Sequence, residues 1–287
     1  MICCRAVSSN KFRKRVRFIL ATLVCFHAHP DDECLGSGGT IARASAEGHR
    51  VVLVVATDGA YGEVPTDLQP GETLADRRLK ELKASAKVLG IARLEMLGYK
   101  DSGMTGWPQN SDSQAFINAD VEAAAQKLAK ILREENADAV TIYDWHGNYG
   151  HPDHIAVHKV GMRAAEIAAT KNIFQMTMNR DFFRNLRNAL MANPDGQSDG
   201  VMRDFDPDAP ADDGNPIGEP DSVITHSVDV RKYCAQKRDA IGCHASQTSD
   251  TSFRVNMTEE IFAQVFGTEW FVKVGEPGPA RDRWLFE

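Results

Sequence analysis

The chain has 287 residues, of which 43% are hydrophobic, and a formal net charge of -7. This length and apolar content suffice for one large α/β domain with a sizeable core. The acidic balance argues against a nucleic-acid surface or a surface for anionic lipids, because both normally carry a basic excess. A small neutral or cationic substrate suits this charge better.

The N-terminus combines a basic stretch with an apolar one. Basic residues between Lys11 and Arg17 precede the apolar run from Phe18 to Phe26, which imitates the first two regions of a signal peptide. No small-residue cleavage site follows the run, and it is far too short to span a bilayer. We therefore expect residues 1–17 to be a disordered extension, residues 18–287 to be a single domain, and the chain to have no integral membrane segment. The six cysteines lack CxxC spacing, so we expect a cytoplasmic protein without a disulfide framework.

Apolar runs and amphipathic segments alternate through the first half of the chain. The expected elements are strand 18–27, helix 36–47, strand 49–57, helix 73–89, strand 93–97, helix 115–135 and strand 139–143. This alternation predicts an α/β, Rossmann-like fold with a mostly parallel sheet and helices on both faces.

The pattern becomes less regular after a helix from Pro152 to Ala168. The stretch from Asn193 to Pro220 is rich in Pro, Gly and Asp and has almost no apolar periodicity, which predicts a long surface loop. The remaining expected elements are strand 222–230, helix 231–243 and a short terminal segment at 259–271.

A first polar cluster follows the first predicted strand. Phe26-His27-Ala28-His29-Pro30-Asp31-Asp32-Glu33 places two imidazoles and three carboxylates within seven residues. Neutral imidazole and carboxylate are ligands that Zn²⁺ and similar ions prefer, and Pro30 favours a turn in which His29 and Asp32 converge on one ion. Asp31 then points elsewhere, as a general base for a metal-activated water. We expect supporting or structural roles for His27 and Glu33.

A second polar cluster, Tyr149-Gly150-His151-Pro152-Asp153-His154, follows the strand predicted at 139–143. Pro152 suits the first turn of a helix, on which His151 and His154 share a face. His158 lies on that face too, so the sequence alone leaves open which imidazole binds a metal. Both clusters lie where strands lead into helices, at the edge where open α/β sheets place their sites. A three-ligand site there leaves a coordination position for water, which points to hydrolysis.

Both clusters resemble the signature motifs of the PIG-L/LmbE-like zinc deacetylases, a family that includes the mycothiol-pathway deacetylase and amidase. The resemblance extends from about Leu23 to about Gln247. Its further motifs are Thr57-Asp58-Gly59, Arg78 and Glu81, Gly98-Tyr99-Lys100-Asp101-Ser102-Gly103-Met104, and His244-Ala245-Ser246-Gln247.

The resemblance implies hydrolysis of an N-acetyl group from an amino sugar, typically N-acetylglucosamine linked to inositol or another aglycone. It makes His29, Asp32 and His154 the ligands of Zn²⁺, although such a site also accepts Fe²⁺. The partner is then a small N-acetylated amino-sugar molecule, and the sequence leaves a homo-oligomer open.

The same resemblance assigns catalytic roles. Asp31 becomes the general base, and His151 becomes a cationic partner of the tetrahedral oxyanion or the leaving amine. Tyr149 supports the oxyanion, while Asp153 holds the ring of His151 and favours its protonated form. The substrate contacts implied are Arg78, Asp101 and Met104.

Three alternatives compete with this hypothesis. One is an amidase for a thiol-sugar conjugate or a secondary metabolite, although such amidases carry a lysine near the position of Leu35. Another is a nucleotide-binding module, in which Gly36-Ser37-Gly38-Gly39 cradles a phosphate at a helix start. The last is a non-catalytic sugar-binding protein, which would need neither Asp31 nor His151.

Overall fold

Seven strands form one mixed sheet in the computed structural model, which describes residues 20–192, 204–279 and 282–287. The strands are β1 (Thr22–His27), β2 (Arg50–Thr57), β3 (Arg93–Tyr99), β4 (Ala139–Tyr143), β5 (Asn172–Thr177), β6 (His226–Asp229) and β7 (Thr268–Lys273). Their order is β3-β2-β1-β4-β5-β7-β6. The first five strands pair in parallel, whereas β7 is antiparallel to both β5 and β6.

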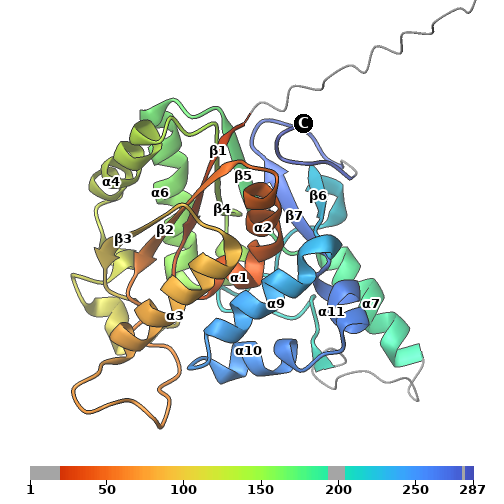
Figure 1. Cartoon of the computed structure of the whole chain (residues 1–287), viewed down its shortest axis with the longest axis horizontal. Coiled ribbons are helices and arrows are strands. Elements are labelled where there is room, and N and C mark those ends of the chain that lie inside the picture. Colours follow the sequence, from red (N-terminus) through yellow and green to blue (C-terminus); the bar gives the residue numbers. More distant parts are fainter. Residues whose placement is uncertain (1–19, 193–203, 280–281) are drawn as a thin grey trace, which may run out of the picture.

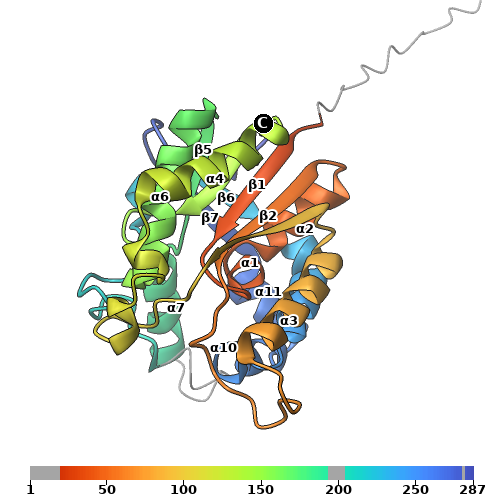
Figure 2. The same cartoon turned by 90° about the vertical axis from the view of Figure 1, so that its left-hand side faces the viewer.

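Helices cover both faces of this sheet, and the predicted Rossmann-like α/β fold is confirmed. They are α1 (Asp32–Gly36), α2 (Gly38–Ala46), α3 (Leu74–Leu89), α4 (Val121–Glu134), α5 (Gly147–Gly150), α6 (Pro152–Ala168), α7 (Arg180–Ala192), α9 (Cys234–Cys243), α10 (Thr248–Val255) and α11 (Glu259–Phe266). Figure 1 shows α9 beside α3, and Figure 2 shows α4 and α6 on one face with α2 and α3 on the other.

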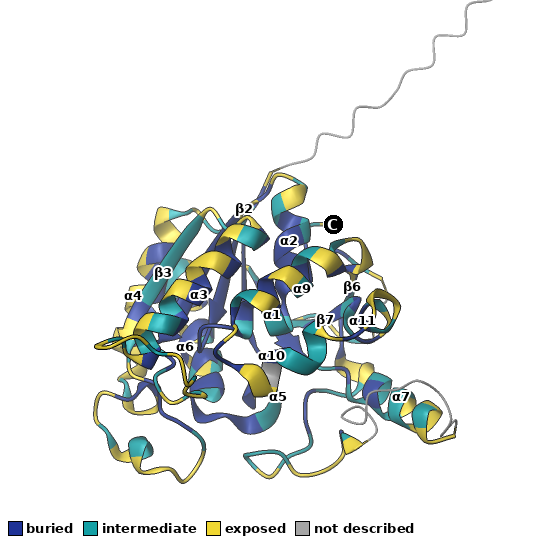
Figure 3. Ribbon diagram, turned by 60° about the horizontal axis from the view of Figure 1, so that its bottom comes forward, coloured by how far each residue is buried: buried dark blue, intermediate teal, exposed yellow. Residues whose placement is uncertain are grey.

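The centre of the sheet is apolar because both of its faces are covered. Leu23, Val24, Cys25 and Phe26 of β1 are completely buried, and every residue of β4 is buried. Figure 3 shows the neighbouring strand β2 in the colour of buried residues, beneath helices whose outer faces are exposed. Such strands therefore appear in the sequence as continuous apolar runs.

The strand order reverses direction between β1 and β4. The chain builds outward from β1 through β2 to β3, and then returns to place β4 on the other side of β1. Open α/β sheets form a crevice at the carboxyl ends of strands where such a reversal occurs. The two polar clusters follow β1 and β4, so the topology brings them to the same crevice.

Several expected boundaries need correction. The helix predicted at 115–135 begins only at Val121, because the carboxylate of Asp120 accepts a hydrogen bond from Ala123 N (2.7 Å) and caps its start. The helix predicted at 36–47 corresponds to α2, Gly38–Ala46, and the short helix α1, Asp32–Gly36, precedes it. The segment at 259–271 divides into α11 and β7, and the strand predicted at 222–230 is shorter, His226–Asp229. β5, α7 and α10 were not predicted.

The predicted loop is described only in part. Residues 204–220 are mostly irregular, and residues 193–203 lie outside the described residues, as does the expected extension at 1–17. The single-domain boundaries stay a prediction. In the described ranges, no helix is long and apolar enough to cross a membrane.

Candidate active site

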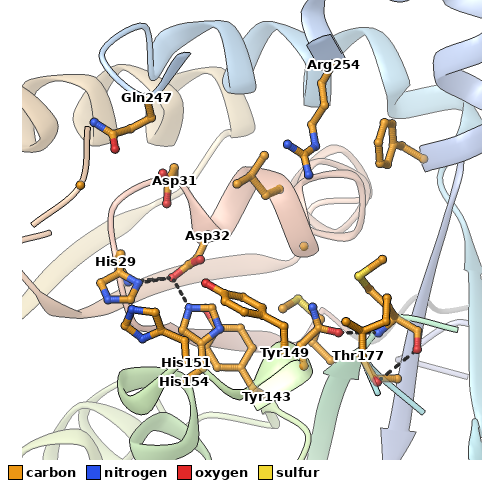
Figure 4. A pocket seen from close by; sticks show the side chains of 18 of the residues that line it. His29, Asp31, Asp32, Tyr143, Tyr149, His151, His154, Thr177, Gln247 and Arg254 are labelled. Atoms are coloured by element: carbon orange, nitrogen blue, oxygen red, sulfur yellow. Dashed lines mark hydrogen bonds and ion pairs between the residues drawn. The ribbon is translucent and has the colours of Figure 1, made fainter. Parts of the chain in front are cut away.

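The turn between β1 and α1 separates the directions of two neighbouring carboxylates. Asp31 has a left-handed backbone (φ 117°), which is uncommon for a residue with a side chain. Its amide donates to the carboxylate of Glu33 (2.9 Å), and its own carboxylate accepts from Arg78 (2.9 Å). These contacts hold the turn so that Asp31 and Asp32 project from different points of the crevice wall (Figure 4).

Asp32 meets two histidines from distant parts of the chain. Its Oδ2 lies 3.3 Å from Nδ1 of His29 and 3.5 Å from Nε2 of His154, as the dashed lines of Figure 4 show. The same oxygen accepts a hydrogen bond from the backbone amide of His29 (2.7 Å). The structure therefore brings together the three residues predicted as metal ligands.

Hydrogen bonds on the far side of each ring select the nitrogen that faces Asp32. Nε2 of His29 lies 3.1 Å from Oδ2 of Asp153, and Nδ1 of His154 lies 3.2 Å from the carbonyl oxygen of Gly147. Because both partners are acceptors, each of these nitrogens carries a hydrogen, so the nitrogens that face Asp32, His29 Nδ1 and His154 Nε2, are the ones that a metal ion would bind in place of a proton. His154 Nε2 is buried and has no hydrogen-bond partner among the described residues. Two imidazole nitrogens and one carboxylate, each imidazole held from behind, suit a divalent ion such as Zn²⁺.

The electrostatics of this cluster also favour a cation. Burial alone would lower the pKa of His29, but the carboxylates of Asp101, Asp153 and Asp32 raise it well above its usual value. Burial would raise the pKa of Asp32, yet His154 and His29 hold it well below its usual value. The crevice therefore concentrates negative charge around the predicted ligands.

His151 lies close to the two predicted histidine ligands but differs from them. Ring nitrogens of His29, His151 and His154 all lie within 4.8 Å of one another. However, Nδ1 of His151 accepts a hydrogen bond from the backbone amide of Asp153 (3.1 Å), so Nε2 carries the hydrogen and is a donor rather than a ligand. Asp32 is thus the better third ligand.

One of the two roles expected at this position needs correction. Burial, aided by His29 and His154, lowers the pKa of His151 to about 2, which disfavours a cationic ring, and its role beside the oxyanion stays a prediction. The carboxylate of Asp153 does not hold this ring; it faces His29 and accepts from the amide (2.9 Å) and hydroxyl of Ser102. The hydrogen bond that Asp153 makes to His151 comes from its backbone amide.

Two tyrosines and a distant loop shape the same wall. The ring of Tyr143 stacks on His154 with centroids 4.3 Å apart, and its hydroxyl lies 3.0 Å from Nδ1 of His27. The ring of Tyr149 meets His154 at 4.8 Å, and its carbonyl accepts from the amide of Asp212 (3.0 Å). Sequence reasoning missed Tyr143, although its place at the end of a predicted strand was a signal, and it missed the contact with Asp212.

His158 is not part of the ligand cluster. Its Nδ1 lies 3.1 Å from the carbonyl oxygen of Tyr143, one turn further along α6. The alternative pair of His154 with His158 is therefore wrong, because the second ring is turned toward the backbone of β4.

Arg78 supports Asp31 from the protein side. Besides Asp31, its guanidinium donates to the carbonyl oxygens of Gly59 (2.8 Å) and Pro30. Burial raises the pKa of Asp31 to about 6, while the charge of Arg78 opposes that rise. A substrate contact by Arg78 stays a prediction, although the residue lines the cavity.

The other predicted substrate contacts also line the cavity. Asp101 accepts from the amides of Tyr61 (3.1 Å) and Gly103 (2.8 Å), which fixes its loop, and Met104 follows in the same loop. Their contact with a substrate stays a prediction.

Glu33 forms a second, sealed cluster directly behind the turn. Its carboxylate accepts from Asp31 N, Ser85 Oγ and the ring of His244 (2.8 Å for the last), and neither Glu33 nor His244 is exposed. Although Glu33, Cys34 and His244 offer ligand atoms close together, the bonds to Glu33 show a structural role that supports the turn. This agrees with the supporting role expected for Glu33.

Comparisons with known proteins show the family of this chain. Residues 24–165 match the model of the PIG-L family, described as GlcNAc-PI de-N-acetylase. A relative from Thermobifida fusca, named 1D-myo-inositol 2-acetamido-2-deoxy-alpha-D-glucopyranoside deacetylase, is 34% identical over 90% of this chain and 94% of its own length. A relative of the same name from Streptomyces avermitilis is 36% identical over 92% of this chain and 96% of its own length.

The fold comparison leads to the same group. The structure of N,N'-diacetylchitobiose deacetylase from Pyrococcus horikoshii matches with a TM-score of 0.56 and 25% identity over 88% of this chain and 84% of that one. The chain belongs to the PIG-L family. The predicted resemblance is therefore confirmed, and the chain is a deacetylase of that family.

The glycine-rich start of α2 does not form a phosphate site in this PIG-L protein. The amides of Gly39 (2.8 Å) and Thr40 (2.7 Å) donate to the two carboxylate oxygens of Glu269, which also accepts from Nζ of Lys237 (2.7 Å). A carboxylate of the protein thus occupies the position that an anion would take at this helix N-terminus. This contact argues against the nucleotide-binding alternative.

A cavity of about 500 Å³ opens beside the predicted ligands, and its two sides differ. What we call the polar side consists of His29, Asp31, Asp32, Asp101, His151 and His154. What we call the apolar side consists of Met176, Phe183, Ile217, Val265, Phe266 and Trp270. The polar side lies entirely within the part of the chain that matches the PIG-L model, and the apolar side lies entirely beyond it.

Proposed function

We propose that this PIG-L protein is a zinc-dependent deacetylase that hydrolyses the N-acetyl group of an N-acetylglucosaminyl substrate. The observation that carries the proposal is the convergence of His29, Asp32 and His154, with Asp31 and His151 beside them at one end of a cavity. Relatives named as deacetylases of an inositol-linked 2-acetamido sugar support an amino sugar joined to a polar aglycone such as inositol.

His29, Asp32 and His154 would hold the ion through Nδ1, a carboxylate oxygen and Nε2. A bound Zn²⁺ supplies Lewis acidity, which polarises an amide carbonyl and lowers the pKa of a water molecule. Fe²⁺ is an alternative occupant, because two imidazoles and a carboxylate accept either ion.

Asp31 is the base in this proposal. Its carboxylate faces the cavity, and the raised pKa places it closer to neutrality than an ordinary aspartate. A base of this kind takes the proton of the attacking water efficiently. Arg78 fixes the carboxylate in place and keeps it ionised, because the neighbouring guanidinium favours the charged form.

His151 and Tyr149 act on the other side of the reacting amide. Nε2–H of His151 is a donor for the oxygen that becomes negative when water attacks, and Tyr149 adds the ring that closes this wall. Asp31, once protonated, is the nearest donor for the departing amine nitrogen. Acetate and the free amino sugar are then the products.

The direct test measures bound metal and acetate release with N-acetylglucosaminyl-inositol for the wild type and for Asp31→Asn. We expect about one equivalent of zinc in both proteins, and we expect Asp31→Asn to lower turnover by about 10²- to 10⁴-fold. A matched control is Asp58→Asn, which changes a carboxylate of the neighbouring β2 loop that caps backbone amides.

Two outcomes would overturn the proposal. One is a wild-type protein that binds no divalent metal and releases no acetate from any N-acetylated amino sugar. The other is an Asp31→Asn protein with full turnover, which would remove Asp31 from the role of base.

A further inference from the structure

The apolar side of the cavity is larger than an acetyl methyl group requires, and we propose that it accepts an N-acyl chain of several carbons. This inference rests on the proposed function, since it takes the scissile amide to lie at the polar side. It extends the substrate class from N-acetyl to longer, unbranched N-acyl amino sugars.

The composition of the apolar side supports an aliphatic occupant. Its six residues carry aliphatic, thioether or aromatic side chains, and Met176, Phe183, Ile217, Val265 and Trp270 are each less than 10% exposed. They come from β5, α7, α11, β7 and the irregular segment before β6, so five separate parts of the chain converge there. Concave sites lined in this way bind apolar groups because contact removes apolar surface from water.

The charged groups near the apolar side have partners within the protein. Nζ of Lys237 lies 2.7 Å from Glu269, and both side chains are 2% exposed. Arg254 lies 4.3 Å from the ring centroid of Phe253 and 5.6 Å from that of Phe266. Lys237 and Glu269 compensate each other, so this pair does not call for a charged ligand.

The geometry of an amide decides which end of the substrate faces the apolar side. A secondary amide is planar and almost always trans, so the acyl chain and the sugar leave the carbonyl in opposite directions. Hydroxyl groups of a sugar suit the polar side, where Asp101 lies. In Figure 4, Asp32 and Tyr149 lie between the histidines and the side that carries Thr177 and Arg254. With the carbonyl at Asp32, the acyl chain therefore points to the apolar side.

The test is a chain-length series with the metal-loaded enzyme. Glucosaminyl-inositol carrying N-acetyl, N-butanoyl, N-hexanoyl or N-octanoyl groups yields the same free amine, which one fluorescent amine reagent measures for all four substrates. We expect kcat/KM to rise with chain length, by up to about fourfold per methylene, with the gain mainly in KM.

A pair of variants tests where the acyl chain of the substrate binds. Val265→Phe fills part of the apolar side, whereas Gln264→Phe places the same side chain on the exposed face of α11. In Val265→Phe we expect the octanoyl-to-acetyl ratio of kcat/KM to fall at least about tenfold, because the octanoyl group loses the contacts of two or more methylenes. In Gln264→Phe we expect the same ratio as in the wild type.

Each other outcome has a defined meaning. If the acetyl substrate is hydrolysed but kcat/KM falls steadily with chain length, the inference is wrong and the proposed function stands. If none of the four amides is hydrolysed, both are wrong. If Val265→Phe changes the hydrolysis of octyl N-acetylglucosaminide but not the N-acyl ratio, the apolar side takes the aglycone, and the acyl assignment is wrong.

Discussion

The polar and apolar sides of the cavity are built by different parts of the fold. The polar side lies at the carboxyl ends of β1, β3 and β4 in the parallel part of the sheet. The apolar side comes from β5, the antiparallel β7, α7, α11 and the irregular segment before β6. Only the polar side falls within the residues that match the PIG-L model. The chemistry of the amide and the choice of the acyl group therefore belong to separable regions.

The two sides also treat charge differently. On the polar side, the carboxylates of Asp101, Asp153 and Asp32 raise the pKa of His29, and His154 Nε2 has no hydrogen bond among the described residues. Near the apolar side, Glu269 is fully engaged by Lys237 and by the amides of α2. A site that binds a cation needs acceptor atoms that no protein group already neutralises. A buried structural ion pair instead needs every charge and hydrogen-bonding group to have a partner within the protein.

The largest expected effect comes from removing a polar-side ligand. Asp32→Ala should abolish zinc binding and lower turnover by more than about 10³-fold, because no other described carboxylate lies between His29 and His154. Metal content by mass spectrometry, with acetate release, measures this. Thr268→Ala, which changes a residue lining the cavity near the apolar side, should keep its zinc. Zinc retained by Asp32→Ala would show that His151 is the third ligand.

Glu269→Ala should give the next largest effect, on stability. It leaves Lys237 buried without its partner, which typically costs about 3–5 kcal/mol of the free energy of unfolding. Urea denaturation measures the loss, and Glu276→Ala is the control, since its ion pairs with Lys273 and Arg283 are partly exposed and contribute little to stability. Zinc affinity of folded Glu269→Ala should be unchanged. A change would mean that the two regions are coupled.

Asp153→Asn should have a smaller effect, confined to the polar side. Without the charge of the Asp153 carboxylate, the hydrogen bond that orients the His29 ring through Nε2–H becomes weaker. Zinc affinity should then fall by about 10- to 100-fold. Competition with a chelator measures this affinity. Asp120→Asn makes the same change at the exposed cap of α4, where Asn caps equally well, so it should leave affinity unchanged. Equal affinities in all three proteins would show that Asp153 serves only Ser102.

The contrast also explains what the sequence could predict. Parallel strands buried on both faces leave continuous apolar runs, so β1, β2 and β4 were predicted well, as was the crevice between them. Local motifs predicted His29, Asp32 and His154 as metal ligands, and the structure places these three side chains together. The directions of side chains were harder to predict, because neighbouring residues at a helix start diverge. Asp153 therefore faces His29 instead of His151.

The apolar side left no comparable signal. Its residues are scattered from 176 to 270, and each contributes one apolar side chain that resembles ordinary core. β5 was missed because it is short and Gln175 interrupts its apolar residues, whereas α7 has apolar residues at helical spacing that the sequence analysis overlooked. The pairing of β5 with β7 joins segments about a hundred residues apart. Convergence of this kind depends on tertiary contacts, which periodicity does not encode.

The smallest expected effect concerns the pH dependence of the antiparallel part of the sheet. Burial, aided by Arg283, lowers the pKa of His226 on β6 to about 4. The folded state therefore binds fewer protons than the unfolded state, whose histidine titrates near 6.5, so stability is full above pH 6.5 and is lost as the pH falls toward 4. His226→Gln removes this titration.

Urea denaturation of the wild type and His226→Gln at pH 7 and pH 4.5 gives the stability that each protein loses on acidification. The difference between the two losses isolates the contribution of His226, because all other groups titrate in both proteins. We expect the wild type to lose about 1 kcal/mol more than the variant, less than the full shift implies, since salt and solvent screen the site. An equal loss in both proteins would show that His226 is protonated within the fold. Zinc content should not differ between them at pH 7, because β6 lies at the edge of the sheet beyond β7 and away from the polar side.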